Sequence, residues 1–344
     1  MAEGQAAAPF LDVRDLHVSF PSPDGVVQAV QGVSFSMSRG QILGIVGESG
    51  SGKSVTSLAI MGLHGRGSQI TGSIKFAGEE LVGADPRRIL QLRGAAMTMI
   101  YQDPLSAMHP YYTVGWQIAE AYKAKNRVSR KAAWNRAVEM LGRVGIPQPE
   151  RRAHDYPHQY SGGMRQRAMI AMALSCDPQL LIADEPTTAL DVTVQSQILD
   201  LIMEIRAESQ TSVIMITHDL GVVAEVADQV LVMYAGQVAE QGTAARVLES
   251  PQHPYTWGLL RSMPRLERSR QDRLNAIPGS PPSLVDVPAG CPFRARCQYD
   301  THTNDLAATT RPVLRQVGPD HWSACHLDDD VRSRIFLEEV KSSL

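Results

Sequence analysis

The sequence has little that would place the protein inside a membrane, on nucleic acid or outside the cell. None of its apolar runs approaches the ~20 residues that a membrane-spanning helix needs. Its formal net charge is −3, and no long run of like charge forms a tail, so composition gives no general attraction to nucleic acid. The N-terminus, MAEGQAAAPF, lacks the basic start and the apolar stretch of a secretory signal peptide. We therefore expect the protein to be made and kept in the cytoplasm.

Cysteine is also scarce, with four residues in a chain of 344. Cys176 follows a predicted helix and is expected to be an ordinary buried thiol. The other three lie late in the chain, at Cys291, Cys297 and Cys325. In a reducing compartment such a late group indicates a metal site before disulfides.

What the chain does contain is the alternation of an α/β protein. With 43% apolar residues it can fill the core of one large domain or two ordinary ones. The stretch from Leu11 to about Phe76 is rich in predicted strands. Two strand–helix units, which begin with QLLIAD and TSVIMITH, predict a parallel sheet later in the chain.

Two regions depart from this alternation. From about Pro104 to Arg152 the pattern is helical, with Ser129 as an expected helix cap, which indicates an inserted helical subdomain over about 104–175. Beyond Pro251 prolines become dense, so we place a domain boundary near residue 250 and expect an extended appendage over 251–344. The main domain then spans residues 10–250.

The strongest motif is GESGSGKS, which fits the phosphate-binding loop pattern and lies between a predicted strand and a predicted helix. In such a loop the backbone amides wrap the phosphates, the lysine reaches the β- and γ-phosphates, and the final hydroxyl holds Mg²⁺. The alternative is a glycine-rich turn with no ligand. The eight residues are Gly47, Glu48, Ser49, Gly50, Ser51, Gly52, Lys53 and Ser54.

Two acids end the predicted strand QLLIAD. Asp184 stands where a carboxylate contacts Mg²⁺ at the carboxyl end of a strand, and Glu185 could orient or deprotonate an attacking water. Taken without the phosphate loop, the two acids could instead start a turn and cap the next helix.

Two further polar residues are weaker indications. His218 follows the strand of TSVIMITH, where its ring could contact a γ-phosphate or the attacking water, or it could be a structural histidine among helix caps. Gln102, in MIYQDP, is a similar case, and without its context it is better explained as a turn residue before Asp-Pro.

A second stretch that could bind an anion follows in YSGGMRQR. Ser161 is a good helix cap, and Gly162 and Gly163 allow backbone amides to approach a ligand at the start of a predicted helix. A chain with one complete phosphate loop has no evident need of a second.

These elements, in this order, resemble the nucleotide-binding subunits of ATP-binding cassette (ABC) transporters over roughly residues 10 to 250. The resemblance implies a parallel P-loop core with an antiparallel β subdomain and a helical subdomain. It implies that GESGSGKS is the Walker A loop and SGGMRQR the signature motif. It further implies the Q-loop glutamine at Gln102, the Walker B acid at Asp184, the catalytic glutamate at Glu185, the D-loop at Asp191 and the switch histidine at His218.

Several binding roles follow from the same resemblance. Phe20 would stack on adenine, although it could also be a core residue at the end of a strand. Mg²⁺ would be held by Ser54, Gln102 and Asp184. Ser161 and Gly163 would point their amides at the γ-phosphate bound by a second cassette, so the site would be shared across a dimer. We expect the second cassette to be a related but different chain, in a heterodimer.

The signature begins Tyr160-Ser161 and has Met164 in fifth place, whereas the general family pattern has leucine first and glutamine fifth. The form SGGMRQR is similar to the oligopeptide and dipeptide importers, whose C-terminal extension resembles about residues 250–327 here. This branch implies two membrane permease subunits, an extracytoplasmic binding protein and a peripheral place on the cytoplasmic face of the membrane. Met108, Tyr111 and Tyr112, expected to be exposed, would receive the permeases, or they could pack the helical subdomain.

Some members of this branch hold a [4Fe-4S] cluster on four cysteines of the extension. Cys291, Cys297 and Cys325 match three of them, and Asn304 stands at the fourth position, where His302 or Asp305 could substitute. The alternatives are a zinc site or plain reduced cysteines.

Three other functions stay open. The same branch includes importers of nickel, glutathione and some oligosaccharides. A soluble ABC ATPase of DNA repair or of the ribosome usually has a long coiled-coil insertion or two cassettes, and this chain has neither. A redox-sensing module in which ATP is only structural would not need the intact Glu185 and His218.

Overall fold

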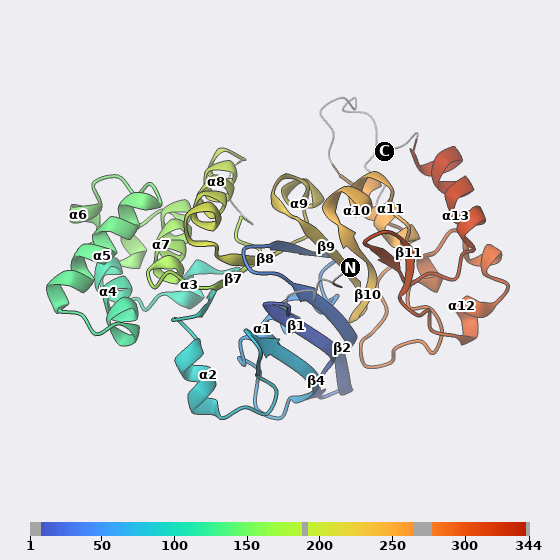
Figure 1. The fold of residues 1–344 in the computed structure, drawn as a ribbon, viewed down its shortest axis with the longest axis horizontal. Coiled ribbons are helices and arrows are strands. Elements are labelled where there is room, and N and C mark those ends of the chain that lie inside the picture. Colours follow the sequence, from blue (N-terminus) through green and yellow to red (C-terminus); the bar gives the residue numbers. More distant parts are fainter. Residues whose placement is uncertain (1–7, 188–191, 264–276, 342–344) are drawn as a thin grey trace, which may run out of the picture. The chain divides into compact units, whose positions relative to one another are not determined.

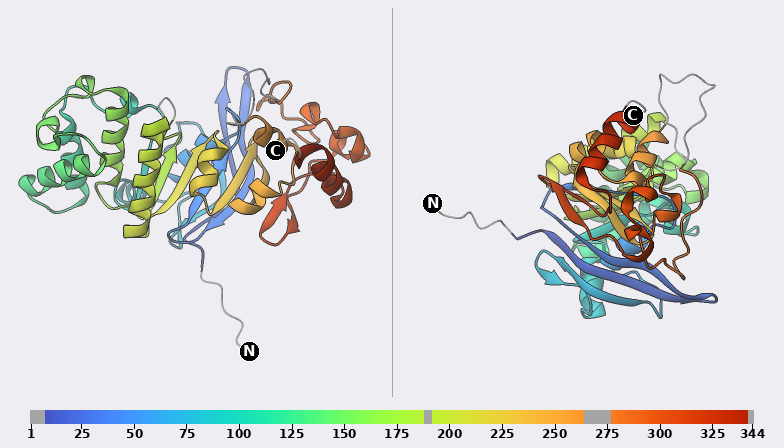
Figure 2. Two further views of the ribbon diagram at one scale, coloured as in Figure 1. Left: turned by 90° about the horizontal axis from the view of Figure 1, so that it is seen from above. Right: turned by 90° about the vertical axis from the view of Figure 1, so that its right-hand side faces the viewer.

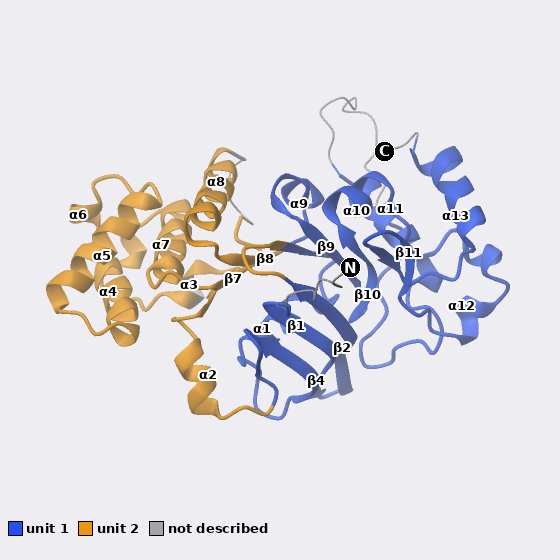
Figure 3. Cartoon of the chain, in the orientation of Figure 1, with its two compact units in different colours: residues 1–37, 43–82, 217–344 blue, residues 38–42, 83–216 orange. Residues whose placement is uncertain are grey.

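The structure is a computed structural model, which describes residues 8–187, 192–263 and 277–341. The chain divides into two compact units (Figure 3). Unit 1 comprises residues 1–37, 43–82 and 217–344, and unit 2 comprises residues 38–42 and 83–216.

Unit 1 begins with an antiparallel sheet in the order β2-β1-β4-β5 (Figure 1). Along β1 the side chains of Leu11, Val13, Leu16 and Val18 are buried, so one face packs on a core as the alternating sequence predicted. The strand-rich reading of this region is confirmed. The strands are β1 (Leu11–Ser22), β2 (Gly25–Met37), β4 (Gln69–Phe76) and β5 (Glu79–Glu80).

A second group of strands in unit 1 surrounds β9. Strand β3 runs parallel to β9, with Ile45 opposite Leu231, and β10 runs antiparallel to β9 on its other side. Apolar side chains of β9 and of the neighbouring helices form its core. The elements are β3 (Ile42–Val46), α1 (Lys53–Ile60), α9 (Leu220–Val226), β9 (Gln229–Tyr234), β10 (Gln237–Thr243) and α10 (Ala244–Glu249).

The described residues beyond position 250, namely 251–263 and 277–341, are also part of unit 1, and they form more helices and strands than the proline content predicted. Strand β12 extends the sheet by pairing with β10, with Ser323 opposite Glu240. Trp257 and Leu327 are buried in a small apolar core of their own. The expectation of an extended appendage is therefore wrong, whereas the boundary near residue 250 stays a prediction. The elements are α11 (Pro254–Arg261), 3₁₀ turns at Arg294–Arg296 and Asp300–Thr303, α12 (Leu306–Thr309), β11 (Arg315–Gly318), β12 (His321–Ser323), α13 (Asp329–Ile335) and a π-helical turn at Phe336–Val340.

Unit 2 contains parallel strands, as the strand–helix alternation predicted. Strand β6 pairs with β7, and β7 pairs with β8, both in parallel. Their residues are buried throughout, which is typical of a parallel sheet covered on both faces. The strands are β6 (Met97–Ile100), β7 (Leu180–Asp184) and β8 (Ser212–Thr217).

Helices make up the rest of unit 2, and α4 to α7, drawn in green, gather into one group in the left view of Figure 2. The predicted cap is confirmed, since the Ser129 hydroxyl oxygen accepts a hydrogen bond from the amide of Ala132 at 3.2 Å. The helices are α2 (Pro86–Leu92), α3 (Pro104–Ala107), α4 (Val114–Lys125), α5 (Arg130–Arg143), α6 (Pro149–Arg152), α7 (Gly162–Leu174) and α8 (Val192–Ser209), with a 3₁₀ turn at Pro157–Gln159. Among the described residues, none of the helices has both the length and the apolar character to cross a bilayer.

Candidate active site

The phosphate loop follows β3 in unit 1 and has a backbone that requires glycine. Gly47 has a φ of +152°, and a Cβ atom there would lie 2.2 Å from the carbonyl oxygen of Met233. Gly52 has a φ of +100°, and its Cβ would lie 2.5 Å from the carbonyl oxygen of Ala29. Any side chain at these two positions would collide with backbone, so the loop is held tightly against β9 and β2.

Lys53 and Ser51 give this loop the chemistry of an anion site. The Lys53 ammonium is buried and donates hydrogen bonds to the carbonyl oxygens of Gly47 at 2.8 Å and Glu48 at 2.9 Å. The Ser51 hydroxyl is buried and has no hydrogen-bond partner among the described residues. The loop thus combines a buried positive charge with an unpaired buried hydroxyl, and both suit an anionic ligand, so the residues fit the phosphates of a nucleotide.

The carboxyl ends of β6 and β7 bring three of the predicted residues together in unit 2. Asp184 is the buried last residue of β7, and Glu185 follows it. Gln102 lies two residues beyond β6, and its side-chain amide donates a hydrogen bond of 2.9 Å to a carboxylate oxygen of Glu185. The juxtaposition follows from the sheet, since parallel strands end at the same edge.

Glu185 has an unusual backbone that sequence reasoning missed. Its φ is +48°, in the left-handed region, where a residue with a side chain costs of order 1–3 kcal/mol. Its amide donates a hydrogen bond of 2.9 Å to the carbonyl oxygen of Ile216 on β8. The strained residue is thus held at both ends, by β8 at its amide and by Gln102 at its carboxylate, and strain of this kind is typical of functional sites.

His218 and Phe20 lie in unit 1. His218 is exposed and directly precedes Asp219, whose carboxylate accepts a hydrogen bond of 2.8 Å from Gly221 and so caps α9. The helix cap is therefore Asp219. Phe20 is half-buried on β1 opposite Val27, so it is not a fully buried core residue.

The signature segment lies at the start of α7 in unit 2. Ser161 is exposed, and its hydroxyl oxygen accepts a hydrogen bond of 3.3 Å from the amide of Met164, which confirms the predicted cap. A Cβ atom at Gly162 would meet nothing within 4 Å among the described residues, and Gly163 is half-exposed. The surroundings of Gly162 therefore leave room for a group from outside the chain.

Tyr160, the residue that departs from the general family pattern, has a clear structural role. It is buried, and its hydroxyl donates a hydrogen bond of 2.9 Å to the carbonyl oxygen of Arg152. Burial raises the pKa of Tyr160 to about 12, so the hydroxyl keeps its proton at neutral pH. The tyrosine thus anchors the chain just before the exposed signature residues to α6.

Gln166 is a site residue that the motif analysis left without a role. It is buried, and its side-chain amide donates a hydrogen bond of 2.7 Å to the carbonyl oxygen of Pro186. This bond ties the signature helix to the residue that follows Glu185. The signal in the sequence is a polar residue among the apolar positions of α7. Asp191, the predicted D-loop residue, lies outside the described residues.

The tentative iron–sulfur ligands are not supported. Cys291, Cys297 and Cys325 are partly buried, and among the described residues no three His, Cys, Asp or Glu side chains could hold a metal ion. Burial raises the pKa of Cys297 to about 12 and that of Cys325 to about 11, which favours neutral thiols over the thiolates that iron and zinc bind. The three cysteines instead pack against apolar core residues. Cys176 is half-buried after α7, and burial raises its pKa also.

Two family models match this chain. The ABC transporter model matches residues 30–188, and the model of the oligopeptide/dipeptide transporter C-terminal region matches residues 239–303. Among solved structures, the dimeric structure of MJ0796, a bacterial ABC transporter cassette, has a TM-score of 0.62 at 25% identity and covers 68% of this chain and 98% of its own. Part of the ABC transporter complex cbiONQ, cbiO1 from Clostridium perfringens, has a TM-score of 0.59 at 26% identity over 70% of this chain and 91% of its own.

Curated relatives match over most of their length. The oligopeptide transport ATP-binding protein OppD of Bacillus subtilis is 53% identical over 84% of this chain and 81% of its own. OppD of Escherichia coli is 48% identical over 94% and 95%. The dipeptide transport ATP-binding protein DppD of Bacillus subtilis is 54% identical over 83% and 86%. The resemblance and fold class expected from the sequence are therefore confirmed, and the chain belongs to the ATP-binding subunits of the oligopeptide/dipeptide ABC transporters.

Proposed function

We propose that this chain hydrolyses ATP at a site shared with a second cassette and thereby energises the import of oligopeptides or dipeptides. As a member of its family it is an ABC transporter ATPase. The observation that carries the proposal is the phosphate loop, where a buried Lys53 and the unpaired hydroxyl of Ser51 form an anion site. Peptide transport is the function named for its relatives OppD and DppD.

The binding roles follow from the loop outward. Lys53 would bind the β- and γ-phosphates, and the amides of Gly47 to Ser54 would surround them. Phe20, half-exposed at the end of β1, offers a ring face for adenine. Ser54, Gln102 and Asp184 supply oxygen ligands of the kind that Mg²⁺ prefers, and the bound ion would offset charge on the phosphates.

The hydrolytic roles fall to Glu185, Gln102 and His218. Glu185 would orient or deprotonate the attacking water, and the side-chain amide of Gln102 fixes its carboxylate through the 2.9 Å hydrogen bond. His218, exposed after β8, would contact the γ-phosphate or the same water. In support of these roles, each of the three residues lies within two positions of the end of a strand.

The signature residues Ser161, Gly162 and Gly163 would act on the nucleotide of the partner cassette, with the D-loop residue Asp191 at the same interface. Support comes from the exposed Ser161 and from the open space at Gly162. We propose a related but different chain as the partner, in a heterodimer. Closure and reopening of the two cassettes would then drive two membrane permease subunits between their states.

An exposed aromatic cluster on unit 2 suits those permeases. Tyr111 and Tyr112 are exposed, as the sequence predicted, and the ring of Tyr112 stacks on exposed Trp116 at 4.1 Å between centroids. Met108 is buried, so its predicted exposure is wrong: it packs in the helical core instead. Exposed aromatic residues are enriched in protein interfaces. This docking would keep the chain at the cytoplasmic face of the membrane, with an extracytoplasmic binding protein delivering peptide and no nucleic acid involved.

Two other functions would use the same chemistry. An importer of nickel, glutathione or an oligosaccharide would leave every ATP-binding role unchanged, because the substrate is selected by other subunits. A soluble ABC ATPase without a membrane partner is disfavoured by the match of residues 239–303 to a transporter-specific region. Peptide-stimulated ATP turnover in the assembled transporter would distinguish the three.

Replacing Glu185 with glutamine tests the catalytic role. The variant keeps the side-chain shape but not the base, so we expect ATP turnover to fall at least 100-fold while Mg-ATP still binds. Turnover would be measured as phosphate release, and binding by calorimetry. As a matched control, Glu208→Gln removes a carboxylate that pairs with Arg143 on the surface of the same unit, and should keep wild-type turnover. Equal turnover in Glu185→Gln and wild type would refute the assignment.

A further inference from the structure

An arginine from the C-terminal extension is bound to the phosphate loop. Arg296 lies in the 3₁₀ turn between Cys291 and Cys297, and its side chain is 3% exposed. Its guanidinium donates two hydrogen bonds to the carboxylate of Glu48, at 2.5 and 2.9 Å. Both residues belong to unit 1, although they are 248 positions apart in sequence. This is a bidentate ion pair with one buried partner, the geometry in which such pairs are strong and specific.

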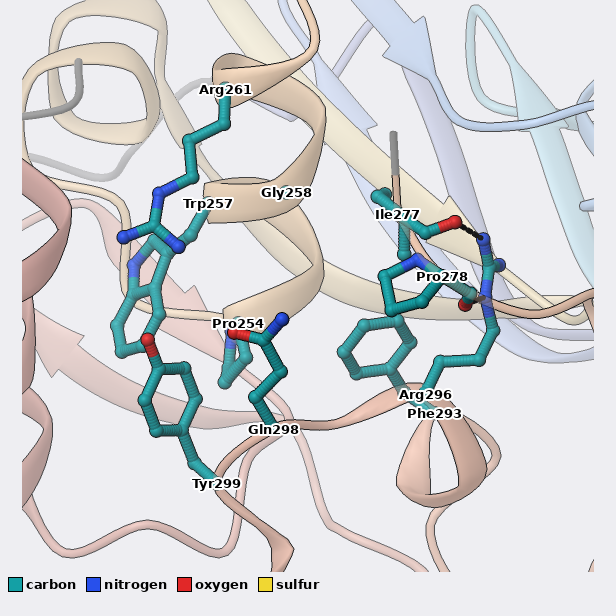
Figure 4. A pocket seen from close by; sticks show the side chains of 10 residues that line it. All are labelled: Pro254, Trp257, Gly258, Arg261, Ile277, Pro278, Phe293, Arg296, Gln298 and Tyr299. Carbon is teal, nitrogen blue, oxygen red and sulfur yellow. Dashed lines mark hydrogen bonds between the residues drawn. The ribbon is translucent and has the colours of Figure 1, made fainter. Parts of the chain in front are cut away.

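The remaining donors of Arg296 are also satisfied. Its Nε donates to the carbonyl oxygen of Pro278 at 2.9 Å, and one terminal nitrogen donates to that of Ile277 at 3.2 Å, at the edge of the pocket in Figure 4. The guanidinium also lies 5.8 Å from the centre of the Tyr234 ring. The hydrogen bond to Glu48 raises the pKa of Arg296 above its ordinary value. The contacts with Pro278, Ile277 and Tyr234 therefore hold the Arg296 side chain in place independently of its ion pair with Glu48.

The backbone of Glu48 is held as firmly as its side chain. Its amide donates a hydrogen bond of 2.8 Å to the hydroxyl oxygen of Tyr255, a fully buried residue of α11. Its carbonyl oxygen accepts the hydrogen bond of 2.9 Å from Lys53. Glu48 is thus held by Tyr255, Lys53 and Arg296, and two of these three residues, Tyr255 and Arg296, lie beyond position 250. The extension is thus built into the wall of the phosphate loop.

The negative charge of Glu48 explains why its ion pair with Arg296 matters for ATP binding. Glu48 is the one acidic residue among Gly47–Ser54, and it directly follows the first glycine of a loop that must accept an anionic triphosphate. A free carboxylate there would repel the phosphates and compete for the Lys53 ammonium. Arg296 neutralises the carboxylate and directs it toward the extension, which reduces its repulsion of an anionic ligand.

We propose that Arg296, together with Tyr255, is a positioning residue for ATP: it withdraws Glu48 and keeps the phosphate loop in shape for the nucleotide. This inference rests on the proposed function, since it needs ATP to bind at this loop. It makes the peptide-transporter extension part of the nucleotide site, because removing one of its side chains would alter ATP affinity.

The test compares two arginines of one turn in the full-length chain. Arg296→Gln should raise the dissociation constant of Mg-ATP about tenfold and raise KM more than it lowers kcat, because ground-state binding is lost. Arg294→Gln, which removes an exposed arginine paired with Asp300, should stay within twofold of wild type. Calorimetry and phosphate release measure both. Wild-type affinity in a folded Arg296→Gln variant would overturn the inference.

A second substitution separates charge from structure. If repulsion by Glu48 causes the loss, then Glu48→Gln combined with Arg296→Gln should recover affinity to within about threefold of wild type, and the defect of Arg296→Gln should shrink with added salt. A defect that persists unchanged in the double variant would mean that Arg296 only supports the fold, which refutes the charge argument.

Two milder variants keep the inference testable if Arg296→Gln fails to fold. Tyr255→Phe removes one hydroxyl from the buried site, and Arg296→Lys keeps the charge but loses the bidentate geometry. Each should raise the dissociation constant of Mg-ATP about threefold, and wild-type affinity in both would overturn the inference. Failure of the wild-type chain itself to bind ATP would instead refute the proposed function.

Discussion

The phosphate loop and the signature segment are both glycine-containing helix starts, yet they differ in what holds them. The loop is enclosed by its own chain: a Cβ at Gly47 would lie 2.2 Å from a carbonyl oxygen, and Glu48 is bound by Arg296 and Tyr255. Around the signature, a Cβ at Gly162 would meet nothing within 4 Å among the described residues. A phosphate-binding loop whose walls come from its own chain can bind a nucleotide without a partner. The signature segment, which is open, is suited to a nucleotide that a partner chain holds.

The largest expected effect tests the enclosed side of this comparison. Gly47→Ala places a methyl group against the carbonyl oxygen of Met233, so the loop must move and ATP affinity should fall at least 100-fold, and turnover with it. Calorimetry measures the affinity. Gly65→Ala is the matched control, since its Cβ would come no closer than 3.9 Å to any neighbour and should leave binding unchanged. Normal ATP binding by Gly47→Ala would show that the loop is not closed by its own chain.

A bulky residue at the signature tests the open side. Gly163→Trp should leave the ATP affinity of the isolated chain within twofold of wild type, because the phosphate loop is untouched. It should lower turnover by the assembled transporter at least tenfold, since the partner's nucleotide would lose its second contact. Gly65→Trp, in an exposed turn, serves as the control for bulk. If Gly163→Trp weakens ATP binding by the isolated chain, the signature would belong to that chain's own nucleotide site.

The smallest expected effect is a pH dependence of folding stability, which arises from His253 beside Tyr255, one of the residues that hold the phosphate loop. His253 accepts a hydrogen bond of 3.0 Å from the amide of Tyr255, and burial lowers its pKa from 6.5 to about 3. The folded chain therefore keeps the ring neutral while the unfolded chain binds a proton below pH 6.5. The contribution of the neutral His253 ring to the free energy of unfolding is fully present above pH 6.5. This contribution is lost as the pH falls toward 3, and the loss is about 2 kcal/mol between pH 7 and pH 5.

His253→Asn isolates that contribution, because asparagine can still accept the hydrogen bond but does not titrate. Urea unfolding at pH 7 and pH 5 should show that the variant loses about 2 kcal/mol less stability than wild type over this interval. An equal pH dependence in both proteins would mean that His253 titrates normally in the fold.

The motif residues could be found from sequence because their chemistry is carried by short, contiguous stretches. The spacing of GESGSGKS specifies a backbone path, and the predicted cap at Ser161 needed only the residues beside it. The strand ends were also predictable, since parallel strands align their carboxyl ends. That alignment is what brings Gln102 to Glu185.

Predictions failed where burial depends on distant segments. Met108 is one of several apolar and aromatic residues in PLSAMHPYY, and only the packing of the fold decides that it is inside while Tyr111 and Tyr112 are outside. The three late cysteines suggested a ligand set, but their surroundings in the fold raise the pKa of Cys297 and Cys325 and leave them as neutral thiols. The proline-rich extension gave no sign of the strand β12, which pairs with β10.

The sequence by itself determined the phosphate loop, its strand and helix, and the acids at the end of β7, because these depend on local spacing and backbone geometry. The tertiary structure alone decided that Arg296 would neutralise Glu48, since the attraction between two charges depends on their distance in space and not on their separation of 248 positions along the chain. The same folding that closes the phosphate loop from within leaves the signature residues open to a partner.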